Sequence, residues 1–553
     1  MKVIIIGGVA GGATAAARLR RLDERLDIVL LERGGYLSYA NCGLPYYIGG
    51  VITEREELFR QSVEGFSSKY KVDSRVYSEV IAINPDKKQV KIKDLQKEEE
   101  YTESYDKLLI STGAFPIRLP IPGIENERIF TLRDVCDTDQ IKDFICKNKP
   151  KKALVVGAGF IGLEMVENLH KLGLNVSIVQ REDQVMLPLD PGMAAIVHQT
   201  LEENQILVYL ENEVKEFKTE GERFLVHLKK GEILETDLVI MSVGVRPEVN
   251  LAKDAGLKIG ELGGIEVNKY LQTSDQDIYA VGDAVEVTNL VTKKQALIAL
   301  AGPANKQGRI VADNIVLGNQ SQYKGSIGTS IAQVFDRVVA VAGSSSKVLN
   351  AEKIAHYQLY FHGQCHAEYY PNALPVTVKL NFSKDKGTIL GAQVIGTRGI
   401  TDTINLFAEA IRKEDTIYDL QEIEHAYAPP FSSAKHIVNI AGYIGENILT
   451  GRVKVIQWHE LTQENPEGLY IIDVRPLFRY EESHVKGAHH IPVENLREHL
   501  LDIPKDKKVV LYCDVGYNAY LGTQILRNNG FDNVYNLSGG YRVYTTATKD
   551  YFK

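Results

Sequence analysis

Apolar and polar positions along the chain predict two similar units in which short strands alternate with helices. Residues 1–33 contain an apolar strand, a glycine-rich turn, a helix and a second strand, and residues 152–181 repeat this order. Short, wholly apolar strands between helical segments are typical of a parallel sheet that helices cover on both faces. We therefore expect an α/β protein with two such sheets.

The pattern between and after these units predicts the domain boundaries. Residues 105–124 and 236–249 each read as a buried strand followed by a proline-containing crossing, and residues 274–287 read as a further strand and turn. From about residue 325 to 450, antiparallel strands with a turn at Asp385-Lys386-Gly387 and a helical stretch indicate an α+β domain. A last α/β unit of about 100 residues has the size of an independent domain. We predict four domains, comprising residues 1–113 with 246–320, 114–245, 321–450 and 455–553.

The composition excludes several classes of protein. The chain has 64 basic and 72 acidic residues and a net charge of −8, without a basic block, which argues against nucleic acid or an anionic membrane as a partner. The first apolar segment is too short for a signal peptide, and no run of about 18 apolar residues predicts a membrane span. Five scattered cysteines in 553 residues cannot form a disulfide framework. We expect a soluble cytoplasmic protein.

The glycines of the second unit predict a dinucleotide-binding turn. Gly157, Gly159 and Gly162 follow an apolar strand and open a helix, where they allow a tight turn and the close approach of a pyrophosphate to the helix N-terminus. The next strand ends in Gln180 and Arg181 rather than in an acid. The missing acid weakens the case for strict NAD use, and Arg181 could meet a 2′-phosphate. We expect NADH to be used and NADPH to be tolerated.

The first unit departs from this fingerprint but keeps its acidic residue. Its turn has Val9 where the second glycine belongs. Glu32 nevertheless ends the following strand, about twenty residues on, where an acid that binds ribose is expected. Two such units in one chain indicate two dinucleotides.

Together with these turns, the stretches TGAFP and AVGDA resemble the two-dinucleotide flavoprotein disulfide reductases over roughly residues 1–445. The resemblance implies that the N-terminal unit binds FAD, the inserted unit binds NAD(P)H, and Asp283 hydrogen-bonds the ribityl chain of FAD. The implied FAD contacts are Gly7, Gly8, Gly11, Gly12, Glu32, Arg33, Thr112, Gly113, Arg133, Asp283 and Ala301. The implied NAD(P)H contacts are Gly157, Gly159, Gly162 and Arg181.

The segment SYANCGLPYYIGG contains a lone cysteine, Cys42, where these reductases place the thiol that faces the flavin. Tyr47 stands at the nearby position where a second thiol would be needed, and the next cysteine is Cys136. A thiolate at this place can be stabilised by the flavin side of the site and a helix N-terminus. Without a resolving partner, Cys42 can attack only the disulfide or persulfide of an external sulfur compound.

The same segment resembles the coenzyme A disulfide reductase branch, which includes NADH oxidases, NADH peroxidases and persulfide reductases. The peroxidases and oxidases carry a histidine in the FAD turn, which this chain lacks. Members that use coenzyme A carry a tyrosine in AYAPPFS, matched here by Tyr427. A second is best matched by Tyr369, with Tyr370 left open. In the branch both tyrosines reach the active site of the other subunit, which implies an obligate homodimer built on residues 325–450. A phenol near sulfur can donate a proton to a leaving thiolate.

The phosphates of coenzyme A require cations. Arg18 and Arg21 lie one turn apart on the first predicted helix, and the resemblance implies that this helix contacts the nucleotide end of coenzyme A. Lys69 or Lys71, which the pattern does not separate, belongs to the same pocket. The other implied substrate contacts are Thr14, Ser38, Asn41, Asn305 and Lys435.

Residues 455–550 resemble a rhodanese domain, in which Cys513 carries a persulfide. The loop 513–518 would fold around this sulfur and offer it N–H groups, with Asp473 and Arg475 below it. Asn518 replaces an arginine that many sulfurtransferases have, and Asp514 adds an acid, so that an anionic thiosulfate donor is disfavoured. Cys136, Cys146 and Cys365 show no ligand spacing, and we predict no metal site, even beside His362 and His366.

These assignments predict an FAD-dependent enzyme in which NAD(P)H reduces coenzyme A persulfide, a polysulfide or a coenzyme A disulfide at Cys42, while Cys513 exchanges sulfane sulfur with coenzyme A. The main alternative is a coenzyme A disulfide reductase that buffers thiol redox state, with the rhodanese domain as a sulfur carrier or delivery module. A persulfide sensor that passes sulfur to a partner is a further reading. An NADH oxidase is less favoured.

Overall fold

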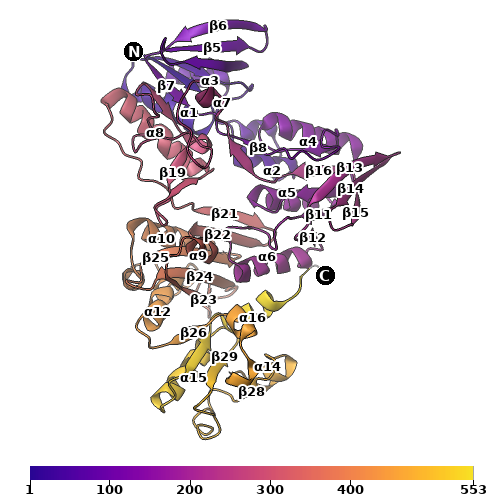
Figure 1. Cartoon of the computed structure of the whole chain (residues 1–553), viewed down its shortest axis with the longest axis vertical. Helices are drawn as coiled ribbons and strands as arrows, with labels where there is room; N and C mark the ends of the chain where they lie inside the picture. The colour runs from indigo at the N-terminus through magenta and orange to yellow at the C-terminus, as the bar shows by residue number, and fades with distance from the viewer. Residues whose placement is uncertain (552–553) are drawn as a thin grey trace. The chain divides into compact units, whose positions relative to one another are not determined.

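The computed structural model describes residues 1–551. The chain packs as two compact units, Met1–Asp183 with Val208–Gly328 and Gln184–Leu207 with Thr329–Lys553, and Figure 1 labels many of their elements. No helix within residues 1–551 is long and apolar enough to cross a membrane.

The first unit contains both predicted dinucleotide sheets. In the N-terminal sheet the strand order is β18-β7-β1-β2-β3 and all four strand pairs are parallel. Four of the five residues of β1 and of β2 are buried, as expected for central strands covered on both faces. The strands are β1 (Lys2–Ile6), β2 (Asp27–Leu31), β3 (Asp73–Arg75), β7 (Lys107–Ile110) and β18 (Ile278–Ala280), and the covering helices include α1 (Ala10–Leu22) and α8 (Ala301–Leu317).

The inserted sheet repeats this design with the order β12-β11-β10-β16-β9. Its central strand β10 pairs in parallel with β11 and β16. The strands are β9 (Ile129–Phe130), β10 (Lys152–Val156), β11 (Asn175–Val179), β12 (Leu207–Tyr209) and β16 (Leu238–Met241), and the glycine turn leads into α5 (Phe160–Lys171). Each sheet has an antiparallel companion, β4 (Ser78–Asn84), β5 (Gln89–Asp94) and β6 (Glu99–Ser104) for the first, and β13 (Val214–Glu220), β14 (Arg223–Leu228) and β15 (Ile233–Thr236) for the second.

The second unit begins with the expected antiparallel sheet, of order β21-β22-β25-β24-β23. The predicted turn at Asp385-Lys386-Gly387 is confirmed, because it joins β24 to β25. β23 forms one edge of this sheet. The elements are β21 (Ser330–Val334), β22 (Arg337–Gly343), β23 (His356–Gln364), β24 (Pro375–Ser383), β25 (Ile389–Gly396), α10 (Ile400–Lys413) and α12 (Ile437–Leu449).

The C-terminal part of this unit is a parallel sheet of order β26-β30-β29-β27-β28. The expected α/β fold is therefore confirmed here as well as in the first unit. The elements are β26 (Lys454–Ile456), β27 (Leu469–Asp473), β28 (His489–His490), β29 (Lys508–Tyr512), β30 (Val534–Leu537), α13 (Trp458–Gln463), α14 (Leu477–Glu482), α15 (Tyr517–Asn528) and α16 (Gly540–Thr548).

One segment packs differently from the predicted boundaries. Residues 184–207, assigned above to the domain 114–245, belong by their contacts to the second unit. Their helix α6 (Pro191–Glu203) packs against α16 and touches β25, and Figure 1 shows it beside α16. The physical reason is a buried ion pair at the start of α6.

Asp190 and Lys379 form this pair, and both side chains are almost wholly buried. Asp190 also accepts from Nε2 of Gln393 at 2.8 Å and from the backbone N–H of Ser346 at 3.1 Å. Burial lowers the pKa of Lys379 to about 8 although Asp190 opposes the shift. For Asp190, burial raises the pKa but Lys379 outweighs it, so that the net shift is downward. The backbone N–H of Lys347 donates to this carboxylate as well, at 3.3 Å, so that all four partners of the carboxylate lie on the antiparallel domain.

We expect Lys379→Met to destabilise the second unit by about 3 kcal/mol, because the buried carboxylate loses its cation. Denaturant unfolding followed by circular dichroism measures the loss. The double variant Asp190→Asn with Lys379→Met should recover most of the stability, since no buried charge remains. Equal losses in the single and the double variant would show that the methionine itself, not the stranded charge, causes the effect.

Candidate active site

Each glycine turn is anchored by the side chain that ends the next strand. The backbone N–H of Gly8 donates to Oε2 of Glu32 at 2.8 Å, and that of Ala158 donates to Oε1 of Gln180 at 2.9 Å. Both acceptors therefore lie at a turn that opens a helix. Gln180 therefore accepts the same hydrogen bond that an acidic side chain would accept here, but it carries no negative charge.

The glycines at the turns are required by space as well as by conformation. Gly7 and Gly157 have φ values of +96° and +102°. A Cβ on Gly12 would lie 1.9 Å from the carbonyl oxygen of Gly7, and one on Gly162 would lie 2.0 Å from that of Gly157. The helices can therefore start close to their sheets only with glycine at these positions.

Other glycines leave room that a ligand can use. A Cβ built on Gly113 or on Gly159 meets no atom within 4 Å. Gly8 and Gly11 differ, since a Cβ there would lie 2.3 Å from Leu37 and 2.8 Å from Val281. Open space at Gly159 lies at the N-terminus of α5, where unpaired N–H groups favour phosphate.

Asp283 fits the ribityl role that the resemblance implies. It lies in the short helix Gly282–Ala284 that follows β18, and burial raises the pKa of its carboxyl. A partly buried carboxylate favours a hydroxyl donor. Thr112, which follows β7, is already engaged within the protein, because its hydroxyl donates to the carbonyl of Glu248 at 2.6 Å.

The cationic residues assigned to the nucleotides lie in three settings. Arg133 lines a cavity of about 400 Å³ together with Arg118 and Arg246. Arg33 lies 3.5 Å from Glu79 in an exposed ion pair. Arg181 is exposed and paired with Glu182 at 2.7 Å, so that a 2′-phosphate would compete with this carboxylate. Ala301, the remaining predicted FAD contact, is the exposed first residue of α8.

Cys42 lies on the helical turn Asn41–Gly43, immediately before the short helix α2 (Leu44–Ile48). Its side chain is exposed, and all five cysteines are free thiols. Burial by the surrounding protein, followed by the charges of Glu164 and Asp283, raises the pKa of the Cys42 thiol. Within the protein, burial and these two carboxylates therefore oppose ionisation of the Cys42 thiol.

The position of the missing second thiol is part of the core. Tyr47 is buried, and the ammonium of Lys142 lies 3.4 Å from the centre of its ring while donating to its carbonyl at 2.9 Å. The side chain at this position therefore contributes to packing, with Lys142 over its ring, and not to thiol chemistry.

Glu164 is a site residue that the sequence prediction missed. It lies in the first turn and a half of α5, and burial raises its pKa to about 7. The hydroxyl of Tyr46 donates to its Oε1 at 3.4 Å. Its negative charge contributes to the raised pKa of the Cys42 thiol. A signal was present in the sequence, since IGLEMVE places this acid between two apolar residues on a glycine-initiated helix.

We expect Glu164→Gln to lower the pKa of the Cys42 thiol, because the substitution removes a negative neighbour that disfavours the thiolate. Glu164 ionises around pH 7, so the difference from the natural enzyme should grow as pH rises through this value. The rate of iodoacetamide alkylation at Cys42, followed by peptide mass spectrometry between about pH 6 and 9, measures the difference. Identical rate profiles would contradict the assignment.

The residues assigned to coenzyme A are partly paired with one another. The Thr14 hydroxyl donates to Oδ1 of Asn305 at 2.6 Å, which brings α1 and α8 together. Arg18 is paired with Asp313 of α8 at 2.7 Å, whereas Arg21 is exposed. Arg21 is therefore more available to a phosphate than Arg18. The two arginines, expected to act together from one face of the helix, are thus not equally available.

The other predicted contacts of coenzyme A have distinct surroundings. Ser38 adopts φ +48° and its N–H donates to the carbonyl of Gly8 at 2.9 Å. Asn41 and Lys435 are exposed, and Lys435 belongs to the second unit. Lys71 lies 3.4 Å from Glu24 in an ion pair, while the Lys69 ammonium lies over the ring of Tyr70 at 5.4 Å. Lys69 thus keeps its charge more available to a phosphate.

Tyr369 and Tyr427 meet in the second unit. Their hydroxyl oxygens are 2.7 Å apart, and 74% and 45% of the two side chains are exposed. The pKa of Tyr369 is raised, first by this hydrogen bond. Tyr370 instead packs edge-on against His366 at 5.7 Å. Contact with Tyr427 favours Tyr369 over Tyr370 as the second tyrosine of the pair.

Cys513 follows β29 at the mouth of a loop that holds its sulfur. Only 4% of the residue is exposed, and the N–H of Gly516 donates to Sγ at 3.1 Å. Gly516 has φ +96° and precedes α15, so this N–H points back at the sulfur at a helix start. Arg475 is held by Asp473 at 2.7 Å and reaches Asp514 at 3.2 Å. The loop can therefore stabilise a thiolate or a terminal persulfide sulfur.

His362, Cys365 and His366, which lie close together in the sequence, do not share one set of contacts. Cys365 Sγ lies 3.0 Å from Nδ1 of His366, and His362 donates from Nε2 to the carbonyl of Gly539 at 3.0 Å. In residues 1–551 no group of three histidine, cysteine or acidic side chains is placed to hold a metal ion.

The fold and the paired turns define a nicotinamide- and flavin-dependent oxidoreductase with an appended sulfur-transfer fold. The family model of the pyridine nucleotide-disulphide oxidoreductases matches residues 1–308, and that of their dimerisation domain matches residues 329–437. The model of the rhodanese-like domain matches residues 456–547. The chain belongs to the pyridine nucleotide-disulphide oxidoreductases and carries a C-terminal rhodanese-like domain.

Related proteins agree with this assignment over most or all of the chain. A coenzyme A disulfide reductase of Staphylococcus haemolyticus is 35% identical over 445 residues, which are 80% of this chain and 98% of that one. A Bacillus anthracis structure described as reduced CoADR-RHD is 46% identical with a TM-score of 0.97, and covers 99% of this chain and 98% of that one. An A. fulgidus NAD-dependent persulfide reductase is 34% identical with a TM-score of 0.92, and covers 98% and 100%. The prediction of a flavoprotein oxidoreductase fused to a rhodanese domain is confirmed.

Proposed function

We propose that this enzyme uses NAD(P)H and FAD to reduce coenzyme A persulfide, or a polysulfide or mixed disulfide of coenzyme A, at Cys42, and that Cys513 exchanges sulfane sulfur with coenzyme A. The observation that carries the proposal is the pair of free thiols in separately built sites, neither with a second cysteine to resolve it. The names of the Staphylococcus haemolyticus and A. fulgidus relatives support the substrate class.

The reaction at Cys42 balances as a thiol exchange followed by a reduction. The Cys42 thiolate attacks the outer sulfur of coenzyme A persulfide, which forms a protein persulfide and releases coenzyme A as thiolate. Two electrons from NAD(P)H, which FAD transfers when it is bound, and a proton then restore the Cys42 thiol and release hydrosulfide. With a mixed disulfide, attack on either sulfur releases one thiol and leaves the other on Cys42. Asp283, Gly113 and Glu32 are the residues that support FAD binding in this account.

Cys513 would supply the sulfane sulfur. A coenzyme A thiolate that attacks the outer sulfur of a Cys513 persulfide takes up that sulfur and leaves the Cys513 thiolate, which the N–H of Gly516 can stabilise. The thiol cofactor then carries sulfur from the rhodanese domain to Cys42. Arg21, Lys69 and Asn41 are the candidates for holding its nucleotide end, because their charges or polar groups are exposed.

The tyrosine pair supports an assembly of two subunits. The matched dimerisation domain spans residues 329–437 and contains both Tyr369 and Tyr427. We propose a homodimer in which the pair of each subunit serves the Cys42 of the other. Two phenols joined by a hydrogen bond can pass a proton to a leaving thiolate.

Tyr427→Phe should lower kcat for coenzyme A persulfide by about 100-fold and leave KM little changed, because the lost proton donor acts in the transition state. Steady-state NADH oxidation coupled to sulfide detection measures both constants. Tyr443→Phe, on α12 and comparably exposed, is the matched control. A rise in KM without a fall in kcat would contradict proton donation and indicate a binding role.

The Staphylococcus relatives, which span the reductase part alone, favour one alternative. In it the enzyme chiefly reduces coenzyme A disulfide as a thiol buffer, and the rhodanese domain delivers sulfur elsewhere. The values of kcat/KM for coenzyme A persulfide and coenzyme A disulfide decide between the two, since a higher value for the persulfide supports the proposal and a higher value for the disulfide supports the alternative.

A further inference from the structure

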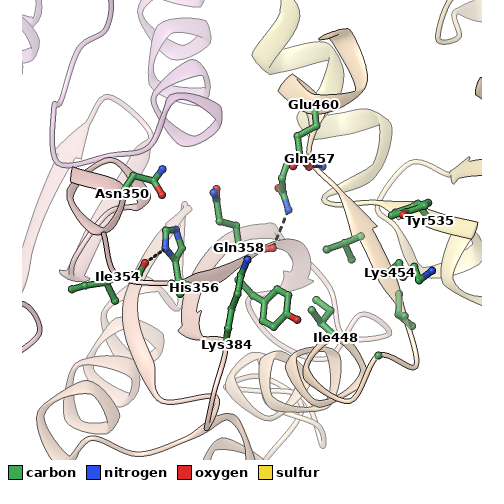
Figure 2. A pocket seen from close by; sticks show the side chains of 15 residues that line it. Asn350, Ile354, His356, Gln358, Lys384, Ile448, Lys454, Gln457, Glu460 and Tyr535 are labelled. Atoms are coloured by element: carbon green, nitrogen blue, oxygen red, sulfur yellow. Dashed lines mark hydrogen bonds between the residues drawn. The ribbon is translucent and has the colours of Figure 1, made fainter. Parts of the chain in front are cut away.

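The second unit contains a cavity that none of the residues assigned above lines. It has a volume of about 640 Å³ and lies between β23, an edge strand of the antiparallel sheet, and β26, an edge strand of the rhodanese sheet. Figure 2 shows His356 and Gln358 on one side of it and Lys454 and Tyr535 on the other. A volume of this size lies within the range of small-molecule sites.

Hydrogen bonds between the two domains hold the walls of this cavity together. Gln457 donates from Nε2 to the carbonyl of Gln358 at 3.0 Å, which Figure 2 marks as a dashed line. Along the same strand, the N–H of Tyr360 donates to Oγ of Ser538 at 2.8 Å. The cavity therefore lies at the interface between the dimerisation and rhodanese domains, and hydrogen bonds between the domains hold its walls in place.

Two polar side chains in the wall are buried and lack a partner on one side. His356 is 9% exposed and Gln457 is 6% exposed. Nδ1 of His356 donates to the carbonyl of Ile354 at 2.8 Å, while no partner for its Nε2 or for Oε1 of Gln457 is found in residues 1–551. Figure 2 shows the bonded ring nitrogen turned toward Ile354 and the other turned away from it.

Both unpartnered atoms accept hydrogen bonds. Burial, the largest cause, lowers the pKa of His356. The ring is therefore neutral with its proton on Nδ1, and Nε2 carries a lone pair. Buried acceptors without donors are unfavourable. An occupant that brings N–H or O–H groups would relieve both.

Two lysines give the cavity positive charge. Lys384 and Lys454 line it, and neither forms an ion pair in the described part of the chain. The ammonium of Lys384 lies 5.3 Å from the ring centre of Tyr357, and that of Lys454 lies 5.7 Å from that of Tyr535. The acidic lining residue, Glu460, accepts the backbone N–H of Gln457 at 2.7 Å as a helix cap.

We propose that this cavity binds a nucleotide. Its phosphates would contact Lys384 and Lys454, and its base would stack against a tyrosine ring. Its amino or hydroxyl groups would donate hydrogen bonds to Gln457 and His356. Cations, flat aromatic faces and unpaired acceptors are the three features that a nucleotide satisfies together, whereas a simple anion satisfies the first alone. Such a ligand would bridge the two domains. The inference goes beyond the reductase and sulfur-transfer activities and does not depend on them.

Photolabelling of the FAD-loaded, full-length enzyme with 8-azido-ADP tests the proposal, because peptide mapping separates this cavity from the two dinucleotide sites of the first unit. We expect label on the peptides that contain Tyr357 or Tyr535, and suppression of this label by ADP but not by equal concentrations of adenosine or pyrophosphate. The emission of Trp458, the only tryptophan of the chain and the neighbour of Gln457, should change with the same ADP dependence.

Replacing both cations (Lys384→Gln with Lys454→Gln) should weaken ADP binding at this site by roughly 100-fold, since two charge-assisted contacts are lost. Both side chains are exposed, so the fold should persist, and NADH-dependent dye reduction verifies it. Lys386→Gln, in the turn after β24 and outside the cavity, is the matched control. Absence of label on the cavity peptides, label that the double variant retains, or protection by pyrophosphate as effective as that by ADP would each overturn the proposal.

Discussion

Cys42→Ser is expected to lower NAD(P)H-dependent release of sulfide from coenzyme A persulfide by at least about 1,000-fold, because a serine hydroxyl cannot displace sulfur from sulfur at neutral pH. The residue is exposed on a short helical turn and makes no disulfide. The substitution should therefore leave folding, flavin content and NADH-dependent dye reduction intact. Stopped-flow reduction followed by steady-state assay of sulfide measures the loss.

Cys136→Ser provides the matched control for this experiment. Cys136 is an exposed free thiol of the same unit, and burial by its surroundings raises its pKa as it does that of Cys42. Its replacement should leave sulfide release unchanged. Full activity of Cys42→Ser, or equal losses in both variants, would contradict a covalent role of Cys42.

Cys513→Ser should abolish the transfer of sulfane sulfur to coenzyme A, with a loss of at least about 1,000-fold, while reduction of preformed coenzyme A persulfide continues. The sulfur is almost wholly enclosed by its loop, and the N–H of Gly516 contacts it. Serine fits the same space but cannot carry a persulfide. Transfer is followed with a sulfane-sulfur donor and coenzyme A by mass spectrometry of the product.

The double assay separates the two activities. In Cys513→Ser, sulfide release from coenzyme A persulfide should keep its natural kcat, while release from the sulfane donor plus coenzyme A should disappear. In Cys42→Ser neither substrate should release sulfide, while transfer of sulfane sulfur from Cys513 to coenzyme A continues and coenzyme A persulfide accumulates. Loss of both activities in Cys513→Ser would contradict independent sites linked by a diffusible thiol.

Much of the fold could be predicted from the sequence because local pattern and global structure agree there. The apolar strands before Gly7 and Gly157 can be buried only as central strands, and their glycines fit turns where a Cβ would collide with backbone. The parallel sheets follow from these constraints. The packing of α6 does not, because it depends on an ion pair between residues 190 and 379, which are 189 positions apart.

The residues of the candidate site could be predicted from the sequence, but their pKa shifts and ion pairs could not. Cys42, Tyr369 and Cys513 stand out in their segments, and the structure gives them exposed or loop-held positions. The rise in the pKa of Cys42 was not foreseen, because both the burial of the thiol and the nearby charge of Glu164 depend on tertiary packing. The pairing of Arg18 with Asp313 likewise joins residues on two helices that the sequence does not connect.

The most direct test of the account is mass spectrometry of the enzyme after incubation with coenzyme A persulfide in the absence of NAD(P)H. The account predicts one added sulfur, or one coenzyme A in disulfide linkage, on the peptide of Cys42, and its removal when NADH is added. Cys136 and Cys146 should stay unmodified. An unmodified Cys42 in an enzyme that nonetheless releases sulfide on addition of NADH would contradict the account.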